Sequence, residues 1–395
     1  MNQIDDPSGH MPIDEIMEKL RANWIPDPGC ESESVDDALG RVPARDVLSL
    51  MDIPVHRGAE CDGIAVRSSD FADGAPDVSS WVLGTDFAMV DMGDDFDDMF
   101  DAVIPIENVD LSGGKLALLG ASVAPGRLVE PKGGTVREGE VLARRGARLS
   151  SIDIANLTTA GITRVSVLKR PKVAFIPTGG ELVPAGSRPS RGQVIDCDSA
   201  MARTLLGPRG AEVVPFPVVN DVRRDLEGIL DQAMSSCDIV LVSGGSSKGT
   251  EDLCPRLIER DAVFFSHYVR ARPGRPIAVA IKDGKAVVNI PGPAFSAYFA
   301  LQWCVCGLIE HWFGLYGTPR PVISARAKNG LALDRLPLAY GLFFEVSTES
   351  GVAVATALDE SRRGELFMRA NAFTILPIGS PGFMAGDTLS LYPID

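Results

Sequence analysis

The spacing of apolar residues changes several times along the chain. Residues 13–22 and 35–39 have the spacing of short helices, and helical spacing returns at 150–161, where Gly161 favours a helix end. Between these stretches, residues 52–145 consist of short apolar runs interrupted by Gly, Pro and Asp, which is typical of β structure. We therefore predict a β-rich segment between two helical ones.

From residue 171 to 311, apolar runs alternate with segments of helical spacing. The strand-like runs are 172–176, 212–219, 238–243 and 286–290, and the helical segments are 199–206, 222–235, 252–260 and 294–309. Strands and helices that alternate at these lengths predict βαβ units and a parallel, doubly wound α/β sheet. Residues 320–395 are strand-like again, so we expect a small β domain at the end of the chain.

Size and composition indicate a multidomain globular protein. The chain has 395 residues, of which 45% are hydrophobic and 23% charged, and a prior of roughly 150 residues per domain suggests several compact units. The first residues lack a basic segment followed by an apolar one. The longest apolar stretch, 295–309, is interrupted by Ser296 and Gln302, and it is shorter than the ~20 residues that a bilayer requires. We therefore expect a cytoplasmic protein without a membrane segment.

Charge and cysteine usage argue against two kinds of site. The formal net charge is −15, whereas proteins that bind nucleic acid non-specifically need a basic surface to displace counterions from phosphates. Seven cysteines without a CxxC pair, with four histidines, do not suggest a zinc site. An anionic small molecule would need a local basic pocket to overcome the overall field, so clustered arginines become informative.

Three of the predicted strands run directly into glycine-bearing turns. These turns are TGGEL (178–182), SGGSSKG (243–249) and IPGPAFSA (290–297). In an open parallel sheet they meet at the carboxyl edge, where exposed N–H groups and helix N-termini favour anions. One glycine after a strand is most often only a tight turn. Three such turns in one sheet predict a crevice for phosphate or another oxyanion.

Three arginines lie close together after the third helical segment, in HYVRARPGRP (267–276). If this run is extended, Arg270 and Arg272 project from the same face, with Arg275 nearby. The run could be a solvated edge strand. The neighbouring anion crevice favours ligand contact instead, because guanidinium groups match the geometry and charge of tetrahedral oxyanions.

Seven segments match those of one known family in order and spacing. ALGRVPARDVLS (38–49) and CDGIAVR (61–67) are similar to that family's ALGRVLAEDV and MDGYAVR. TGGEL (178–182), SGGSSKGTED (243–252), RPGRP (272–276) and IPGPAFSA (290–297) are similar to TGDEL, SGGxSxGxxD, KPGKP and LPGNPVSA. GELFMRANAFTILP (364–377) is similar to a segment in which Ala-Asn precedes a strand. From about residue 13 to its end, the chain resembles the MoeA and gephyrin E-domain family.

This resemblance implies four structural units. They are a helical and mixed domain from 11–51 and 146–170, an inserted β-rich domain at 52–145, a doubly wound molybdopterin-binding domain at 171–317 and a C-terminal β-barrel domain at 318–395. The resemblance also implies a homodimer, with the site between the doubly wound domain of one subunit and the inserted region of the other.

The implied activity is that of a molybdopterin molybdenumtransferase. Such an enzyme takes adenylylated molybdopterin and molybdate, releases AMP with the help of Mg²⁺ and leaves molybdenum on the dithiolene. Its expected protein partners are a molybdopterin adenylyltransferase and recipient molybdoenzymes. Molybdate and tungstate are tetrahedral dianions of nearly equal size, so the sequence fits either.

Three acids match catalytic positions of the family: Asp62, Glu181 and Asp252. Asp252 and Glu181 would also hold Mg²⁺ against anionic oxygens. Each acid has an ordinary structural explanation as well: Asp252 as a helix N-cap, Glu181 as the start of a solvated helix and Asp62 as part of an Asp-Gly turn. Both interpretations stay open at this point.

The positions that match contacts to molybdopterin and its phosphate lie mainly in the glycine turns. They are Thr178, Gly179, Asp196, Ser243, Gly244, Gly245, Ser247, Gly249, Pro291 and Gly292. Arg272, Arg275 and Ser296 match contacts to molybdate, and arginine replaces lysine at both basic positions. The positive charge that an oxyanion needs is therefore kept.

The chain also departs from the family at several positions. Gly134 and Thr135 replace two acids of RGED, Gly180 replaces the acid of TGDE, MGDD at 92–95 replaces TGAP, Pro293 and Ala294 replace Asn-Pro, and Lys248 adds a positive charge. The loss of these carboxylates weakens the expectation that the chain catalyses the reaction more than the expectation that it binds the ligand. The acidic run from Asp91 to Asp101 is either a solvated loop or a source of replacement metal ligands.

Three functions remain compatible with these residues. The first is an active molybdenumtransferase. The second is a divergent paralogue that binds molybdopterin, molybdate or a partner protein without completing the reaction. The third is a non-enzymatic, gephyrin-like scaffold that docks partner peptides.

Overall fold

A computed structural model gives the fold of this chain. It describes residues 9–111, 115–120, 123–220, 222–245, 253–315, 320–333, 337–359 and 361–394. The chain forms two compact units, a large unit made of Met1–Gly29 and Lys169–Asp395 and a small unit made of Cys30–Leu168. Among the described residues, no helix is both long enough and apolar enough to cross a membrane. The four domain boundaries expected above stay predictions.

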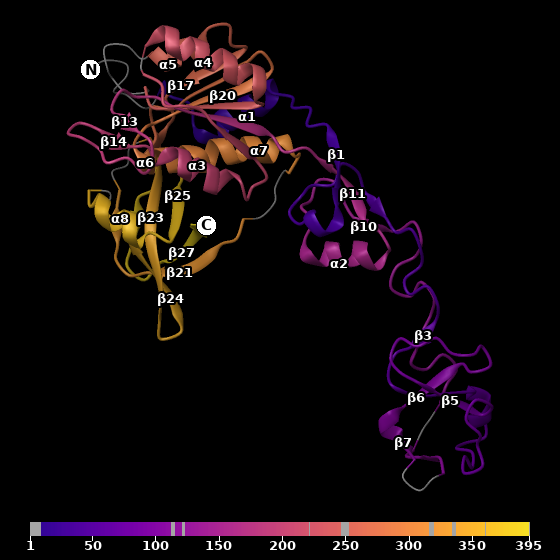
Figure 1. Cartoon of the computed structure of the whole chain (residues 1–395). Helices are drawn as coiled ribbons and strands as arrows, with labels where there is room; N and C mark the ends of the chain where they lie inside the picture. The colour runs from indigo at the N-terminus through magenta and orange to yellow at the C-terminus, as the bar shows by residue number, and fades with distance from the viewer. Residues whose placement is uncertain are drawn as a thin grey trace. The chain divides into compact units, whose positions relative to one another are not determined.

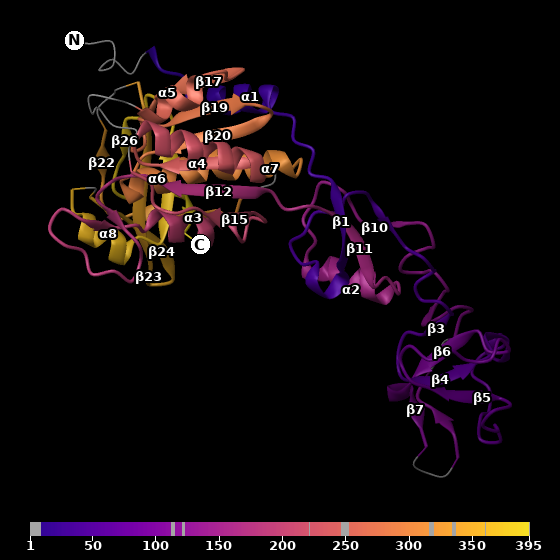
Figure 2. The same cartoon turned by 45° about the horizontal axis from the view of Figure 1, so that its top comes forward.

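A six-stranded sheet forms the centre of the large unit (Figures 1 and 2). In spatial order its strands are β15 (Glu212–Pro215), β12 (Lys172–Pro177), β16 (Ile239–Ser243), β20 (Lys285–Ile290), β19 (Ala278–Lys282) and β17 (Phe264–His267). The first four are parallel, as predicted. The predicted parallel arrangement does not extend to β19 and β17, which run antiparallel. The β19–β20 hairpin turns at Asp283 and Gly284, both at positive φ, and such tight turns connect antiparallel strands.

Helices cover both faces of this sheet. The helices α4 (Arg223–Ser236) and α5 (Leu253–Glu259) pack on one face against Ala174, Ile176 and Val242. Figure 1 shows α3 (Asp198–Leu206), α6 (Ala294–Ala300) and α7 (Cys306–Trp312) on the other side, and α1 (Ile13–Asn23) contacts β17 and β19. Burial on both faces explains why the central strands are continuous apolar runs. The predicted helix at 294–309 is present, with a π-helical segment at Leu301–Val305.

The C-terminal part of the large unit is a closed β-barrel. Its strands are β23 (Ala339–Glu349), β24 (Val352–Ala357), β21 (Ile323–Ala327), β27 (Thr388–Pro393) and β25 (Ala372–Leu376), which pairs back with β23. The short helix α8 (Arg363–Arg369) contacts β23, and β22 (Leu331–Ala332) pairs with β26 (Gly382–Phe383). The ring of Phe299 in α6 makes a tilted contact with Phe343 and an edge contact with Phe373 of the barrel. The barrel and the sheet therefore share α6 as a common packing element.

One half of the small unit surrounds an antiparallel pair, β1 (Cys30–Ser34) and β11 (Arg164–Leu168). Helix α2 (Ser151–Thr159) starts with a capping box formed by Ser150 and Asp153. The predicted helix at 35–39 is only a 3-10 turn at Val35–Asp37. The strands β2 (Val47–Leu48) and β10 (Val141–Ala143) form a second pair.

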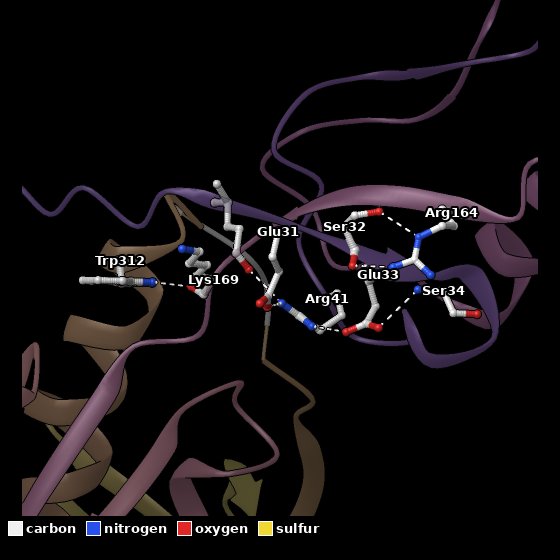
Figure 3. Close-up of polar contacts among 9 residues, drawn as sticks. Glu31, Ser32, Glu33, Ser34, Arg41, Arg164, Lys169 and Trp312 are labelled. Atoms are coloured by element: carbon white, nitrogen blue, oxygen red, sulfur yellow. Dashed lines mark hydrogen bonds and ion pairs between the residues drawn. The ribbon is translucent and has the colours of Figure 1, made fainter.

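Arg41 holds the β1–β11 pair together. Its buried guanidinium donates to the carboxylates of Glu31 and Glu33 and to the carbonyl oxygen of Leu168. Figure 3 shows the Arg41 side chain between the two glutamates, with the Arg164 side chain reaching Ser32 further along the strand. One charged guanidinium thus serves three acceptors at this point of the pair.

The other half of the small unit is the β-rich segment predicted from the sequence. The strand β4 (Gly63–Val66) lies between β5 (Phe87–Val90) and β6 (Ala102–Pro105), with apolar clusters on both faces. Shorter pairs join β3 (Gly58–Ala59) to β9 (Val129–Glu130) and β7 (Val109–Asp110) to β8 (Ala117–Leu118).

Candidate functional site

A cavity of about 550 Å³ lies at the carboxyl ends of β12, β16 and β20. This is the edge of the sheet at which the sequence places the three glycine turns. Its wall is formed by residues of these turns together with the β13–β14 region, the start of α3 and the start of α6. The volume lies within the range of small-molecule sites. The predicted crevice is therefore present as a cavity.

The turn after β16 requires glycine at position 244. Gly244 has a φ of +104°, and a Cβ atom there would overlap the carbonyl oxygen of Thr178. The N–H of Gly244 donates to Ile290 O at 3.1 Å, and the N–H of Thr178 donates to Ser243 O at 2.8 Å. The three turns are thereby bonded to one another through main-chain atoms. Ser243, Gly244 and Gly245 all line the cavity, as do Pro291 and Gly292.

The turn after β12 contributes Thr178 and Glu181 to the cavity. Thr178 is buried, whereas Glu181 is exposed at the rim. Gly179 has a φ of +146° and donates its N–H to Val219 O at 3.0 Å. Gly179 is therefore a structural member of the turn, and it does not line the cavity.

The strands β13 (Leu182–Val183) and β14 (Val194–Ile195) form a short parallel pair beside the cavity. The chain then enters α3 through Asp196, Cys197 and Asp198, all of which line the cavity. Asp196 accepts hydrogen bonds from the N–H and the hydroxyl of Ser199. Its carboxylate therefore stabilises the first turn of α3 while facing the predicted ligand region.

Asp198 is a cavity residue that the sequence analysis did not single out. Its side chain is buried, and Oδ2 accepts a hydrogen bond of 2.8 Å from the hydroxyl of Ser243. Burial raises the pKa of this carboxyl from 3.8 to about 6, the bond from Ser243 offsets part of the rise, and the charge of Asp196 adds to it. In the sequence, Asp198 could have been noticed as the second acid of IDCDS (195–199). Its burial could not, because it depends on the position of β16.

The thiol between these acids is not set up as a nucleophile. Burial raises the pKa of Cys197, and the neighbouring charge of Asp198 adds to the rise. Cysteine is reactive as a thiolate. A protonated Cys197 therefore serves as part of the cavity wall.

The three residues expected to contact molybdate differ in their place relative to the cavity wall, although Gly274 between the two arginines lies against Ser296 O. Ser296 lines the cavity, as does Pro276, but Arg272 and Arg275 do not. Arg272 is exposed, and the guanidinium carbon of Arg275 lies 5.9 Å from the ring centre of Tyr268. Arg270 donates to the carbonyl oxygen of Pro337 at 3.0 Å, so it contributes to the fold. Among the described residues of the wall, the charged groups are carboxyls and none is Lys or Arg.

Asp62 belongs to the small unit and is not among the residues that line this cavity. Its Oδ1 accepts a hydrogen bond of 2.8 Å from the N–H of Met92. Gly63 is required beside it, because a Cβ atom there would overlap the carbonyl oxygen of Ile104 in the neighbouring strand. The Asp-Gly pair thus has a structural role in this loop.

The remaining predicted positions fall outside what the structure describes. Ser247, Lys248, Gly249 and Asp252 lie in the segment 246–252. Within the described ranges, no three His, Cys, Asp or Glu side chains converge in a way that could hold a metal ion. Ligation of Mg²⁺ by Glu181 and Asp252 therefore stays a prediction, and so does a metal role for the acidic run at 91–101.

Comparisons with known proteins agree with this architecture. Residues 11–161 match the model of the MoeA N-terminal region (domains I and II), and residues 174–311 match that of a probable molybdopterin binding domain. The molybdopterin molybdenumtransferase of Haemophilus influenzae is 26% identical over 92% of this chain and 93% of its own length. The enzyme of the same name from Staphylococcus epidermidis is 26% identical over 91% of this chain and 90% of its own length.

A solved structure of similar architecture extends over nearly the whole chain. The molybdopterin biosynthesis MoeA protein of Pyrococcus horikosii is 26% identical, with a TM-score of 0.77, and covers 97% of this chain and 99% of its own. The two family models, the relatives and the solved structure agree that the MoeA N-terminal region precedes the molybdopterin-binding domain. The chain belongs to the MoeA family.

Proposed function

We propose that this chain is a molybdopterin molybdenumtransferase, acting on adenylylated molybdopterin and molybdate. One observation supports this most: the cavity is built by the three glycine turns that the family uses for its pterin ligand. The reaction consumes one water as the phosphoanhydride between the pterin phosphate and AMP is cleaved. The two thiol groups of the pterin then bind molybdenum through their sulfurs, and their two protons leave with one oxide of molybdate as water.

In this proposal the main chain binds the phosphate of the ligand. The N–H of Gly245 would donate to this phosphate at the carboxyl edge of the sheet, where parallel strands commonly bind ligands. Thr178 and Ser243 add hydroxyl groups to the same wall. Binding therefore does not depend on any of the acids that the chain has lost.

Two acids of the wall would act on the reacting phosphate groups. Glu181 is the exposed carboxylate at the rim, and Asp198 is a buried carboxyl that can hold or release a proton near neutral pH. Cleavage of a phosphoanhydride moves protons and concentrates negative charge on phosphate oxygens, which a proton donor stabilises. Mg²⁺ would neutralise the same charge when it is bound with the substrate.

The decisive experiment measures AMP release. Purified protein would be mixed with adenylylated molybdopterin, molybdate and Mg²⁺, with tungstate as a second oxyanion. We expect AMP in the parent and little AMP with Glu181→Gln. A parent that binds the adenylylated pterin and releases no AMP would establish the divergent, non-catalytic paralogue instead, which the replacements at Gly134, Thr135 and Gly180 favour. Peptide capture without any pterin binding would favour the scaffold.

We also propose a homodimer. The β2–β10 pair of the small unit exposes Leu48 and Val141 on adjacent strands, with Leu50 and Val55 exposed nearby in the sequence. Large exposed apolar surface is typical of interaction sites. A second copy of the chain would cover it and supply Asp62 in trans.

Mixing two inactive variants tests this arrangement. Asp62→Asn and Glu181→Gln would be unfolded together and refolded. If each site takes Asp62 from one subunit and Glu181 from the other, mixed dimers hold one intact site, and random pairing restores about a quarter of the parent activity. No recovery in mixed dimers of proven composition would contradict a shared site.

A further inference from the structure

Asn289 is a fully buried amide directly behind the cavity. It belongs to β20, is 0% exposed and lies opposite Val242 of β16 in the sheet register. Its Nδ2 donates to two main-chain carbonyl oxygens, that of Val242 at 3.1 Å and that of Gly244 at 2.7 Å. Its Oδ1 is buried without a hydrogen-bond partner in the described structure. A buried polar group without a partner is costly, so the two donated bonds must be important enough to keep this side chain.

The bond to Gly244 O determines the direction of the next peptide group. The Gly244–Gly245 peptide is planar and trans, so its C=O and N–H point in opposite directions. Since Asn289 holds the C=O, the N–H of Gly245 must point away from β20. Gly245 lines the cavity, and its N–H donates to no described residue. Within the described part of the chain, this N–H is therefore left for a ligand.

The two glycines could not hold that direction by themselves. Gly244 and Gly245 have φ values of +104° and +63°. Glycine occupies both signs of φ with similar ease, so the peptide between two glycines can rotate at little cost. Asn289 provides a side-chain hydrogen bond that opposes this rotation.

We propose that Asn289 is a positioning residue that directs the Gly245 N–H into the cavity as a donor for a tetrahedral oxyanion such as phosphate. The inference rests on the proposed function, because it concerns the same phosphate-binding turn. An amide is suited to this role because both of its targets are carbonyl oxygens and require a donor. The isosteric carboxylate of aspartate would place negative charge against them and favour a rotated peptide.

The test uses inorganic sulfate as the probe, because its charge does not change over the pH range of the experiment. Binding would be measured by calorimetry, and the direction of the Gly245 N–H by its amide resonance. Asn289→Asp should lose about tenfold in affinity at about pH 8 and regain most of it at about pH 5, because a protonated carboxyl can donate to Gly244 O. Affinities are compared with the parent at each pH, which removes the contribution of Asp198.

Gln302→Glu is the matched control. Gln302 is also a buried amide of the large unit, 1% exposed, and it donates to the hydroxyl of Tyr298. The same amide-to-acid change there should lower stability without changing sulfate affinity or the Gly245 resonance. Asn289→Ser, which keeps one short donor, gives a second variant if Asn289→Asp does not fold, and we expect for it a smaller loss that does not vary with pH.

The outcomes separate this inference from the proposed function. A parent that binds sulfate while both Asn289 variants bind it equally well at both pH values would overturn the role of Asn289 alone. A parent that binds no sulfate, with no change at Gly245, would overturn the oxyanion cavity itself. A loss of affinity in Gln302→Glu as large as in Asn289→Asp would show that general destabilisation, and not the direction of the peptide, explains the effect.

Discussion

The cavity of the large unit is made mostly of main chain, whereas the loop around Asp62 in the small unit presents a side chain. At the cavity, Gly244 packs so closely against the carbonyl oxygen of Thr178 that a Cβ atom would not fit. The side-chain amide of Asn289 donates to the carbonyl oxygen of Gly244. In the small unit, Asp62 is exposed and is held by one hydrogen bond from Met92.

This difference explains which features of the family the chain has kept. A site formed by N–H groups tolerates replacement of nearby side chains, because its donors belong to every residue. A site formed by carboxylates does not. The acids at positions 134, 135 and 180 could therefore be lost without loss of the fold, and the proposed binding is expected to persist even if turnover has changed.

Gly244→Ala should have the largest effect. The new methyl group would overlap Thr178 O, and the residue would keep a φ that L-residues avoid. We expect a loss of about 3 kcal/mol or more in the free energy of unfolding, together with loss of oxyanion binding. Chemical denaturation and calorimetry measure these two quantities. Unchanged stability would mean that the turn after β16 is not as rigid as the structure indicates.

Asp198→Asn should change stability in a pH-dependent way. The folded-state pKa of about 6 lies above the ordinary 3.8. The contribution of this carboxyl to the free energy of unfolding is therefore complete below about pH 4 and is lost as the pH rises through 6. Above that pH the parent contains a buried charge that the variant lacks. We expect the variant to be more stable by up to about 3 kcal/mol at pH 8 and equal to the parent at about pH 4.

Thermal unfolding across this range checks the prediction for Asp198. A stability difference that does not vary with pH would show that the carboxyl does not titrate in the folded protein. If Asp198 also donates a proton in the reaction, AMP release by the variant should lose its dependence on a group with a pKa near 6.

Arg41→Met tests whether a side-chain network in the small unit affects stability without affecting the cavity of the large unit. The change removes the guanidinium donor of Glu31, Glu33 and the carbonyl oxygen of Leu168, while Glu33 keeps the bond from the N–H of Ser34 (Figure 3). Both glutamates are partly exposed and can be rehydrated, so we expect a loss of about 1–3 kcal/mol. Arg41→Lys should recover part of it. Sulfate affinity should stay unchanged, since the cavity lies in the other unit; a change in affinity would contradict this separation.

Gly180→Asp should have the smallest effect on stability and the most informative effect on activity. A Cβ at Gly180 would lie 3.7 Å from its nearest neighbour, Asn220 Oδ1, so the side chain fits. We expect stability within about 0.5 kcal/mol of the parent. If the lost acid limits turnover, AMP release should rise. Gly134→Ala is the contrasting control, because its Cβ would lie 2.9 Å from Pro131 O and should destabilise the loop.

Much of the site could be predicted from the sequence because its main elements are local. A strand that ends in two glycines specifies an exposed turn, and the order of turns along the chain placed Thr178, Ser243 and Pro291 at one edge of a sheet. The same reasoning does not settle the place of Arg272 and Arg275, whose contact with an oxyanion stays a prediction. Ala271 and Arg272 pair with β23 of the barrel, a contact that no local pattern contains.

The sequence by itself determined the family, the alternation of strands and helices and the glycine turns, because each depends on spacing within a few residues. Only the tertiary structure decided that β19 and β17 run antiparallel, that Asp198 is buried against Ser243 and that Asn289 donates to Gly244. Asp198 is 45 residues from Ser243 in the sequence, and Asn289 is 45 residues from Gly244. Burial, hydrogen bonding and pKa depend on neighbours in space, and those neighbours exist only once the strands have paired.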